Sequence, residues 1–533
     1  MKRLILRLVV AGLITALLTP GPSAPSGARA LQNRPDTSLL AYAVRVARSD
    51  DNAFYVLGEI AVRYAEVGQF NRALQLANSI DDEAERDVAK AKIATRLRIS
   101  GDTQRASEIL ASIQLFTESN GAKFPRHKTY ILGRIVEELA ACGAFERVFE
   151  LARINDDAYL IRTALDAVLN NFVPDENERG DLNVLSEIIR LSARINNGED
   201  RTVLTKVAEK YAQAGEYGKA LRLAASLTDH GEEVFNFHRD SAIENIALLL
   251  AKRGEFTRAI KLAESIDDYF KFTALTQIAK EQITQGRNDQ AIKLLAKVTP
   301  PFLAEPYEEL DFDDAGFGAE RLAEAAVAYA AAGKREKAEE LLAIALKRAK
   351  RVRKFTERDT ALRSVAVSYA EAGMFEQAAD AAQPVNFTYL SIMPLADVAV
   401  VLLRQKRNSE VQQVVKMIRD ASIEDGPESK ADSLVEIAGE YLTLGDTEPA
   451  AEILSAAFEI ARDGSFNHLH PLTLGRLAVT LAQAGKFSKA IEVIAEIKGS
   501  FYRASALADI GVLQARAGWT PDAQARSILN RMI

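Results

Sequence analysis

Cysteine and aromatic residues are scarce in this sequence of 533 residues, which has a single cysteine and 7% aromatic side chains. One thiol excludes an intrachain disulfide, so we expect a fold that needs no covalent cross-link. Cys142 stands beside Gly143, where a helix is predicted to end, and we interpret it as a small buried residue. Positive charge is not in excess either: the net charge is −7. A broad basic surface is therefore not expected, and we predict no nucleic-acid partner.

Signatures of catalysis are missing as well. The sequence has no G-x-S-x-G, no phosphate-binding glycine loop, no dinucleotide fingerprint and no H-E-x-x-H. We therefore predict that the protein is not an enzyme and has no cofactor or metal, although a catalytic triad need not be local in sequence. The alternative is a metal-dependent hydrolase that uses His468 and His470, which are close enough to share a metal. No third ligand is visible nearby, which favours solvated loop residues.

Long apolar runs are absent after the first thirty residues. Near the start, basic residues precede an apolar run from Leu8 to Leu18, and Ala28-Arg29-Ala30 matches an A-x-A cleavage site. This pattern predicts a cleavable signal peptide over residues 1–30 and export to the periplasm or the extracellular space. A membrane anchor is the competing interpretation, but eleven apolar residues fall short of the roughly 20 needed to span a bilayer. No transmembrane segment is expected in the mature chain.

One phrase recurs along the rest of the chain, and its first clear copy is IAVRYAEVGQFNRALQLANSI, from Ile60 to Ile80. Apolar residues at helical spacing on both sides of a glycine predict two helices joined at that glycine. An alanine five residues after the glycine and another seven before it would let the paired helices approach closely, while the glycine ends the first helix in a left-handed conformation. The turn glycines are Gly68, Gly101, Gly143, Gly215, Gly254, Gly286, Gly333, Gly373, Gly445, Gly485 and Gly518.

Two gaps of 72 residues between these glycines each predict one hidden, degenerate unit. Gly180 and Lys406 are the candidates for the missing turn positions. The total is then about thirteen antiparallel helix pairs. Aspartates in phrases such as Ile80-Asp81-Asp82 are expected to cap the next helix, and a basic residue such as Arg86 often follows them.

This set of positions resembles the tetratricopeptide repeat (TPR) family, from about Asp36 to the C-terminus. The turn glycine, the aromatic residue two positions later (Phe70) and the two alanines (Ala61, Ala73) match the helix-turn-helix consensus, whereas the consensus tryptophan is replaced by residues such as Leu57. The resemblance implies an all-α, right-handed α-solenoid. It also implies a non-catalytic scaffold that binds another protein or a peptide.

Two stacks of helix pairs are predicted, over residues 31–298 and 319–533. Between them, residues 299–318 contain three prolines and six acidic residues, and we interpret them as an acidic loop, a hinge or a binding element. Residues 37–49 are predicted to form a lone helix that covers the first pair. The final helix, from Pro521, carries polar residues on its outer face, as expected of an end cap.

Two candidate binding surfaces follow from this arrangement. In TPR proteins a partner commonly lies along the first helices of the pairs, where the position six before the turn glycine is charged at Glu137, Glu209 and Lys280. At Val62, Leu248, Val327, Val367, Val479 and Val512 the same position is apolar, and these residues either line a groove or pack between repeats.

The second candidate is a basic run, comprising Lys347, Arg348, Lys350, Arg351, Arg353 and Lys354. A solvated helix face is one interpretation of this run. An adaptor that docks on an anionic membrane or envelope surface, or on an acidic partner, is the alternative.

Overall fold

The computed structural model describes residues 38–50, 53–113, 126–174, 182–195, 200–227, 236–300, 314–382, 392–421, 426–463 and 471–533. These ranges are helical and contain no strand. The predicted signal peptide lies outside them, as do residues 301–313 of the predicted acidic loop. The all-α class expected from the sequence is confirmed.

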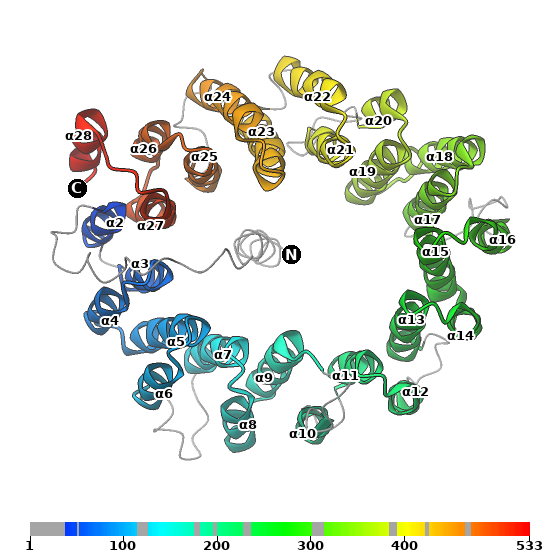
Figure 1. Cartoon of the computed structure of the whole chain (residues 1–533), viewed down its shortest axis with the longest axis horizontal. Helices are drawn as coiled ribbons and strands as arrows, with labels where there is room; N and C mark the ends of the chain where they lie inside the picture. Colours follow the sequence, from blue (N-terminus) through cyan, green and yellow to red (C-terminus); the bar gives the residue numbers. More distant parts are fainter. Residues whose placement is uncertain are drawn as a thin grey trace. The chain divides into compact units, whose positions relative to one another are not determined.

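The helices follow one another as a first and a second helix of successive pairs (Figure 1). The first helices are α3 (Phe54–Glu66), α5 (Glu83–Ile99), α7 (Arg126–Ala141), α9 (Ala158–Asn171), α11 (Arg201–Gln213), α13 (Phe237–Lys252), α15 (Asp268–Thr284), α17 (Asp314–Ala331), α19 (Phe355–Glu371), α21 (Met393–Arg404), α23 (Gly426–Thr443), α25 (Pro471–Gln483) and α27 (Ser500–Ala517). The second helices are α4 (Phe70–Asn78), α6 (Thr103–Ala111), α8 (Phe145–Ile154), α10 (Leu182–Ser192), α12 (Tyr217–Ser226), α14 (Phe256–Ala263), α16 (Asn288–Val298), α18 (Arg335–Ala349), α20 (Phe375–Ala381), α22 (Asn408–Asp420), α24 (Thr447–Asp463), α26 (Phe487–Glu496) and α28 (Ala523–Arg531). One further helix, α2 (Leu39–Ala47), precedes the first pair.

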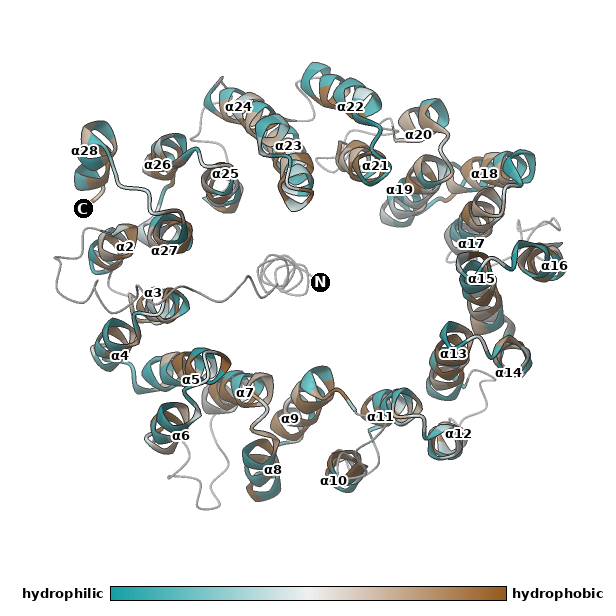
Figure 2. Cartoon of the chain, viewed as in Figure 1, coloured by the Kyte–Doolittle hydropathy of each residue, from teal (hydrophilic) through white to brown (hydrophobic). Residues whose placement is uncertain are grey.

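The chain divides into two compact units. One unit contains both ends of the chain, up to Ala73 and from Val415 onward, and the other contains Leu74–Phe387 and Ser391–Val414. Within each unit, successive first helices pack on one another, as α5 does on α7 and α25 on α27. Most helices carry both hydrophobic and hydrophilic residues (Figure 2), which fits packing on one side and solvent on the other.

The turn glycine ends the first helix as the sequence predicts. Gly68 has φ 76° and its N–H donates to the Ala65 carbonyl, while the N–H of Gln69 reaches back to the Tyr64 carbonyl. This is a Schellman C-cap, which requires a left-handed residue that glycine adopts without strain. Lys406 takes the same place with φ 61° and the same two hydrogen bonds, from Lys406 to Leu403 and from Arg407 to Leu402. The degenerate turn predicted at Lys406 is therefore confirmed, whereas Gly180 lies outside the described residues.

The small residues beside the turn are buried between paired helices. Ala61 and Ala73 have no exposed surface, and the corresponding alanines of the other pairs are buried in the same way. Ala523, five residues after Gly518, is the exception because it is exposed. The last turn therefore departs from the repeat.

Side chains of one repeat donate hydrogen bonds to backbone carbonyls at the end of a helix in the preceding repeat. Gln285, just before its turn glycine, donates from Nε2 to the carbonyls of Ala251 and Lys252 at the end of the preceding first helix, both at 3.3 Å. Gln405 makes the equivalent bonds to Ala370 and Glu371. The last carbonyls of a helix have no partner within the helix, so these contacts join one repeat to the next.

The aspartate phrases act as helix caps. Asp82 Oδ1 accepts from the backbone N–H of Glu85 at 2.8 Å, which confirms the predicted cap of α5. The basic residue that follows has a separate role, since Arg86 Nη1 donates to the Ile80 carbonyl at 3.0 Å. Arg503 contacts the Ile497 carbonyl in the same manner at 2.8 Å.

The two ends of the chain pack together in the unit that contains them. Helix α2 lies beside α27 and is packed more extensively on it than on α3 (Figure 1). The Leu39 backbone N–H donates to Gln514 Oε1 at 2.8 Å, and Tyr42 Oη donates to Asn530 Oδ1 at 3.2 Å. We expected α2 only to cover the first pair, and that expectation was incomplete because its main partner is the last first helix.

Helix α3 completes this junction. Arg63 forms an ion pair with Asp509 on α27 at 2.8 Å, and the Tyr55 ring stacks on Phe501 with ring centres 5.8 Å apart. Ser500 Oγ donates to Asp50 Oδ2 at 2.5 Å. Thus α3 packs on α27 as one first helix packs on the next, although the two are at opposite ends of the sequence.

Candidate binding surface

An open hollow of about 580 Å³ lies on first helices of the unit that contains Leu74–Phe387, called the middle unit below. Helices α15, α17, α19 and α21 supply its lining residues, which are mostly charged or hydroxyl-bearing. They are Lys280, Glu320, Arg321, Glu324, Thr360, Arg363, Ser364, Val367, Ser368, Glu371 and Asp397. The hollow therefore runs across several consecutive repeats.

Ion pairs hold the two sides of the hollow. Glu324 on α17 lies 3.5 Å from Lys280 Nζ of α15 and 3.2 Å from Arg321 Nη1, and it also accepts a hydrogen bond from Gln277. On the other side, Arg363 of α19 makes a two-pronged contact with Asp397 of α21, with Nη2 to Oδ1 at 2.8 Å. Paired charges of this kind fix side-chain positions across neighbouring repeats.

Two carboxyl groups at the α13–α17 end are poorly solvated. Burial raises the pKa of Glu244, on α13, to about 7, with Arg321 opposing this shift and Glu324 adding to it. Burial also raises the pKa of Glu320, which lines the hollow, and Arg321 again opposes the shift. A desolvated carboxylate gains free energy when a cation or a hydrogen-bond donor approaches it. This end of the hollow is therefore suited to basic or donor groups of a ligand.

The structure places the three predicted groove residues apart. Lys280 lines the hollow and pairs with Glu324. Glu209 on α11 is half-buried and accepts from Gln213 Nε2 at 2.9 Å, and Glu137 is exposed on α7. The hydroxyl row of α19 and the Arg363–Asp397 pair were missed from the sequence, because none of them stands at the position six residues before the turn from which the groove was predicted.

The apolar position six before the turn serves both of the purposes considered from the sequence. Val62 on α3 and Val512 on α27 are buried, and these two helices pack on each other. Leu248, Val327, Val367 and Val479 remain partly exposed, and Val367 lines the hollow. The same repeat position therefore packs between helices in one region and faces a surface in another.

The basic run lies where α18 ends and α19 begins. Lys347, Lys350, Arg351, Arg353 and Lys354 are exposed, whereas Arg348 is largely buried. Lys354 forms an ion pair with Glu357 one turn into α19. The run thus presents several cations on one short stretch of surface.

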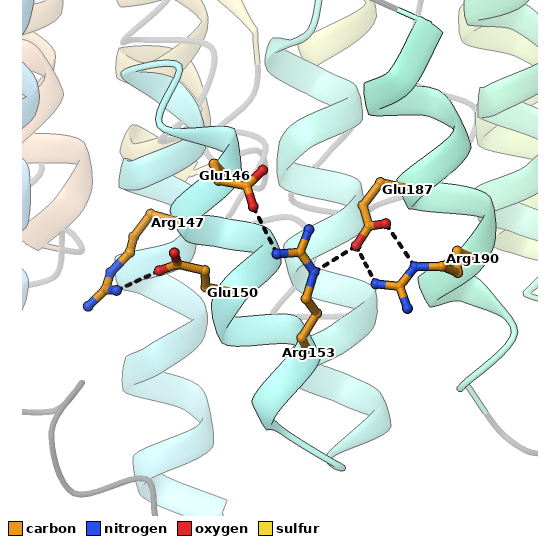
Figure 3. A network of polar contacts seen from close by, with 6 residues as sticks. All are labelled: Glu146, Arg147, Glu150, Arg153, Glu187 and Arg190. Atoms are coloured by element: carbon orange, nitrogen blue, oxygen red, sulfur yellow. Dashed lines mark hydrogen bonds and ion pairs between the residues drawn. The ribbon is translucent and has the colours of Figure 1, made fainter.

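A second charged network joins the second helices α8 and α10 (Figure 3). Arg153 bridges Glu146 and Glu187, both at 2.8 Å, and Arg190 makes two hydrogen bonds to Glu187, at 2.6 and 2.8 Å. The hydrogen bonds from Arg190 and then Arg153 lower the pKa of Glu187, against the effect of burial. Arg190 and Glu146 are exposed, whereas Glu187 is only 19% exposed; ion pairs with exposed partners contribute little free energy.

Among the residues that the structure describes, no group of three or more His, Cys, Asp or Glu side chains could hold a metal ion. His468 and His470, the ligands of the alternative hydrolase, lie outside those residues. Across the same ranges, no helix is both long and apolar enough to cross a membrane.

The chain was compared with protein families, curated proteins and solved structures. No family model and no curated protein matches the chain. Among solved structures it is similar to the pentatricopeptide repeat protein PPR10 in complex with an 18-nt psaJ RNA element, at 12% identity and a TM-score of 0.31, over 88% of this chain and 61% of PPR10. It is also similar to a human IFIT1 dimer with m7Gppp-AAAA, at 14% identity and a TM-score of 0.25, over 86% of this chain and 94% of IFIT1. Its own succession of helix pairs makes the chain a helical repeat protein.

These matches correct one expectation from the sequence. We predicted no nucleic-acid partner, yet PPR10 and IFIT1 are helical repeat proteins seen with RNA. The prediction relied on the net charge of −7, which averages over a long surface that holds separate acidic and basic regions. The exclusion of nucleic acid is therefore wrong.

Proposed function

We propose that this protein is an exported, non-catalytic scaffold that binds an extended segment of another protein in the hollow of α15–α21. The single observation that supports this most is the hollow itself, which crosses four consecutive first helices and is lined by polar groups. A ligand that crosses several repeats in one direction must be elongated. An extended peptide has that form, and its backbone amides match a polar lining.

The hydroxyl groups of α19 support a peptide ligand. Thr360, Ser364 and Ser368 are spaced four residues apart, so they lie on one face of the helix along the hollow. Hydroxyl groups both donate and accept, so they can bond the polar groups of an extended backbone. Thr360 Oγ1 already donates to the Thr356 carbonyl at 2.9 Å, so it is available as an acceptor for a backbone N–H. Such contacts are largely independent of the partner's side chains.

The lining needs little ordering before a ligand binds. Lys280, Glu324, Arg363 and Asp397 are already held by the ion pairs described above. A preformed surface reduces the entropic cost of association, which then falls mainly on the partner segment.

Affinity capture tests the binding site. The tagged chain is used on the exported fraction, beside Ser364→Arg, which fills the hollow, and Lys280→Glu, which reverses a lining charge. Glu137→Lys is the matched control, because Glu137 lies on a first helix away from the lining. We expect both hollow variants to lose the same captured protein and the control to keep it. Capture unchanged by Ser364→Arg would place the binding site elsewhere.

Export is tested separately by sequencing the N-terminus of the protein in the exported fraction. The A-x-A pattern at Ala28-Arg29-Ala30 supports cleavage after Ala30, so the mature chain is expected to begin at Leu31. Full-length protein retained in the cytoplasm would contradict the proposal of export.

The exposed cations between α18 and α19 favour a second candidate function, that of an adaptor on an anionic membrane surface. Five of the six residues in this run are exposed. Sedimentation with phosphatidylglycerol vesicles should then be salt-dependent, and it should be lost when the exposed five are changed to glutamine. Binding of single-stranded RNA without binding of vesicles would assign the run to nucleic acid instead.

A further inference from the structure

The hollow of α15–α21 is lined by more carboxylates than cations. Four carboxylates and three cations stand in its lining. Lys280 and Arg321 both pair with Glu324. Arg363 pairs with Asp397. Each cation of the lining is therefore engaged by a carboxylate of the same lining.

The other two carboxylates of the lining belong to Glu320 and Glu371. Glu320 is half-buried on α17, and the cation that acts on it is Arg321, which already pairs with Glu324 at 3.2 Å. Glu371 is exposed at the end of α19. These two groups give the hollow its excess of negative charge.

Glu244 on α13 extends this excess beyond the lining. It stands ten residues before its turn glycine, as Arg363 of the lining does, so the repeat puts the two side chains on the same face of their first helices. Its carboxyl is half-buried and interacts with the charges of Arg321 and Glu324. With Glu244 included, five carboxylates face three cations.

The spacing of these carboxylates fits an organic cation better than a metal ion. In the described part of the chain no three acidic, histidine or cysteine side chains converge closely enough to hold a metal. A lysine or arginine side chain needs no such convergence, because it can pair with a single carboxylate and donate its other hydrogens to hydroxyl oxygens. Thr360, Ser364 and Ser368 supply such oxygens along α19.

We propose that the hollow selects a basic segment, with a lysine or arginine side chain of the ligand against Glu320. This inference rests on the proposed peptide-binding function of the hollow and adds to it the charge of the ligand. A half-buried carboxylate is poorly solvated, so it gains more from a cationic partner than an exposed carboxylate does.

A peptide selection on the full chain tests the charge of the ligand. A phage-displayed library of random dodecapeptides is selected in parallel on the wild-type chain and on Ser364→Arg, which fills the hollow. Peptides retained by the wild type but not by Ser364→Arg bind in the hollow, and we expect an excess of lysine and arginine among them. Circular dichroism verifies that the variant keeps its helical content. Should it not, Val367→Trp fills the hollow instead, since Val367 also lines it.

A second measurement locates the contact. The tightest of these peptides is labelled and titrated by fluorescence anisotropy, and we expect it to bind Glu320→Gln about tenfold more weakly than the wild type. Glu376→Gln is the matched control, because Glu376 is exposed on the second helix α20 and lies outside the lining. The control should leave the affinity unchanged.

The outcomes separate this inference from the function on which it rests. Hollow-dependent peptides without an excess of basic residues would overturn the inference and leave the proposed function standing. Unchanged affinity for Glu320→Gln would also overturn only the inference, as would displacement of the labelled peptide by single-stranded RNA, which is an anion. Retention of the same peptides by the variant with a filled hollow would overturn the proposed function and the inference together.

Discussion

The first helices of the two units present different surfaces despite the same repeat. In the unit that contains both chain ends, α27 is packed against α2 and α3, and Val62 on α3 and Val512 on α27 are buried. In the middle unit, α15–α21 leave an open hollow in which Val367 is partly exposed among charged and hydroxyl groups. The difference shows that the same repeat position can be covered by a neighbouring helix in one unit and left open in the other.

The largest loss of stability is expected from a substitution in the buried contact between α2 and α27. Leu40→Asp puts a carboxylate into a contact that excludes water, and we expect a loss of about 4 kcal/mol in the stability of the α2–α27 pair. Hydrogen exchange should become faster in α2 and α27 and remain unchanged in α15–α21. Equal acceleration in both regions would show that the two surfaces are not independent.

Gly511→Ala should change the stability by less than Leu40→Asp does, and the sign of that change is informative. Glycine to alanine in a helix interior normally stabilises by about 1 kcal/mol, but here the added Cβ overlaps Leu40. We expect a loss of about 2 kcal/mol from the resulting displacement. Gly439→Ala in α23 is the matched control in the same unit, because a Cβ there meets nothing within 4 Å. The control should raise the melting temperature; if Gly511→Ala also raised it, Leu40 would not be seated on Gly511.

The helix next to the hollow, α13, carries a group whose ionisation makes stability depend on pH. The pKa of Glu244 is raised by burial from 4.5 to about 7, so between these values the folded chain holds a proton that the unfolded chain has released. Stability contributed by this group therefore falls as pH rises from 4.5 to 7. Glu244→Gln should add about 1 kcal/mol at pH 8 and nothing near pH 4. Thermal melts of both proteins at the two pH values measure this, and an equal gain at both would assign the effect to packing.

The smallest effect is expected in the exposed network of α8 and α10. Glu187→Gln removes the carboxylate that Arg153 and Arg190 share, but surface ion pairs of this kind contribute less than about 1 kcal/mol. The change in melting temperature should be slight and should disappear in 1 M salt. A large, salt-independent loss would give the network a greater structural role than its exposure suggests.

The helical repeat was predictable from the sequence because its signals are local. The glycine turn, the flanking alanines and the aspartate cap each act within a few residues, and even the left-handed Lys406 followed from the spacing of its neighbours. Of the three predicted groove residues, Lys280 lines the hollow, and the groove itself stays a prediction. Contacts such as Arg363 with Asp397 depend on which repeats lie side by side, and no single repeat encodes that.

The pairing of α2 with α27 left signals that could have been found. Ala43 and Ala47 match the second-helix pattern, and the alanine expected seven residues before Gly518 is replaced by Gly511. Each departure is small alone. They become informative only together: α2 lacks a first helix of its own, and α27 is followed by α28, which does not pair with it in the usual register.

A helix pair drawn from both termini also sets the order of events during synthesis. The Leu39–Gln514 contact separates its two residues by 475 positions. At about 5 to 20 residues per second, α2 waits on the order of half a minute or more after leaving the ribosome before α27 exists. Throughout that interval α3 is the native partner available to α2, and the larger contact, with α27, forms only when the last helices emerge.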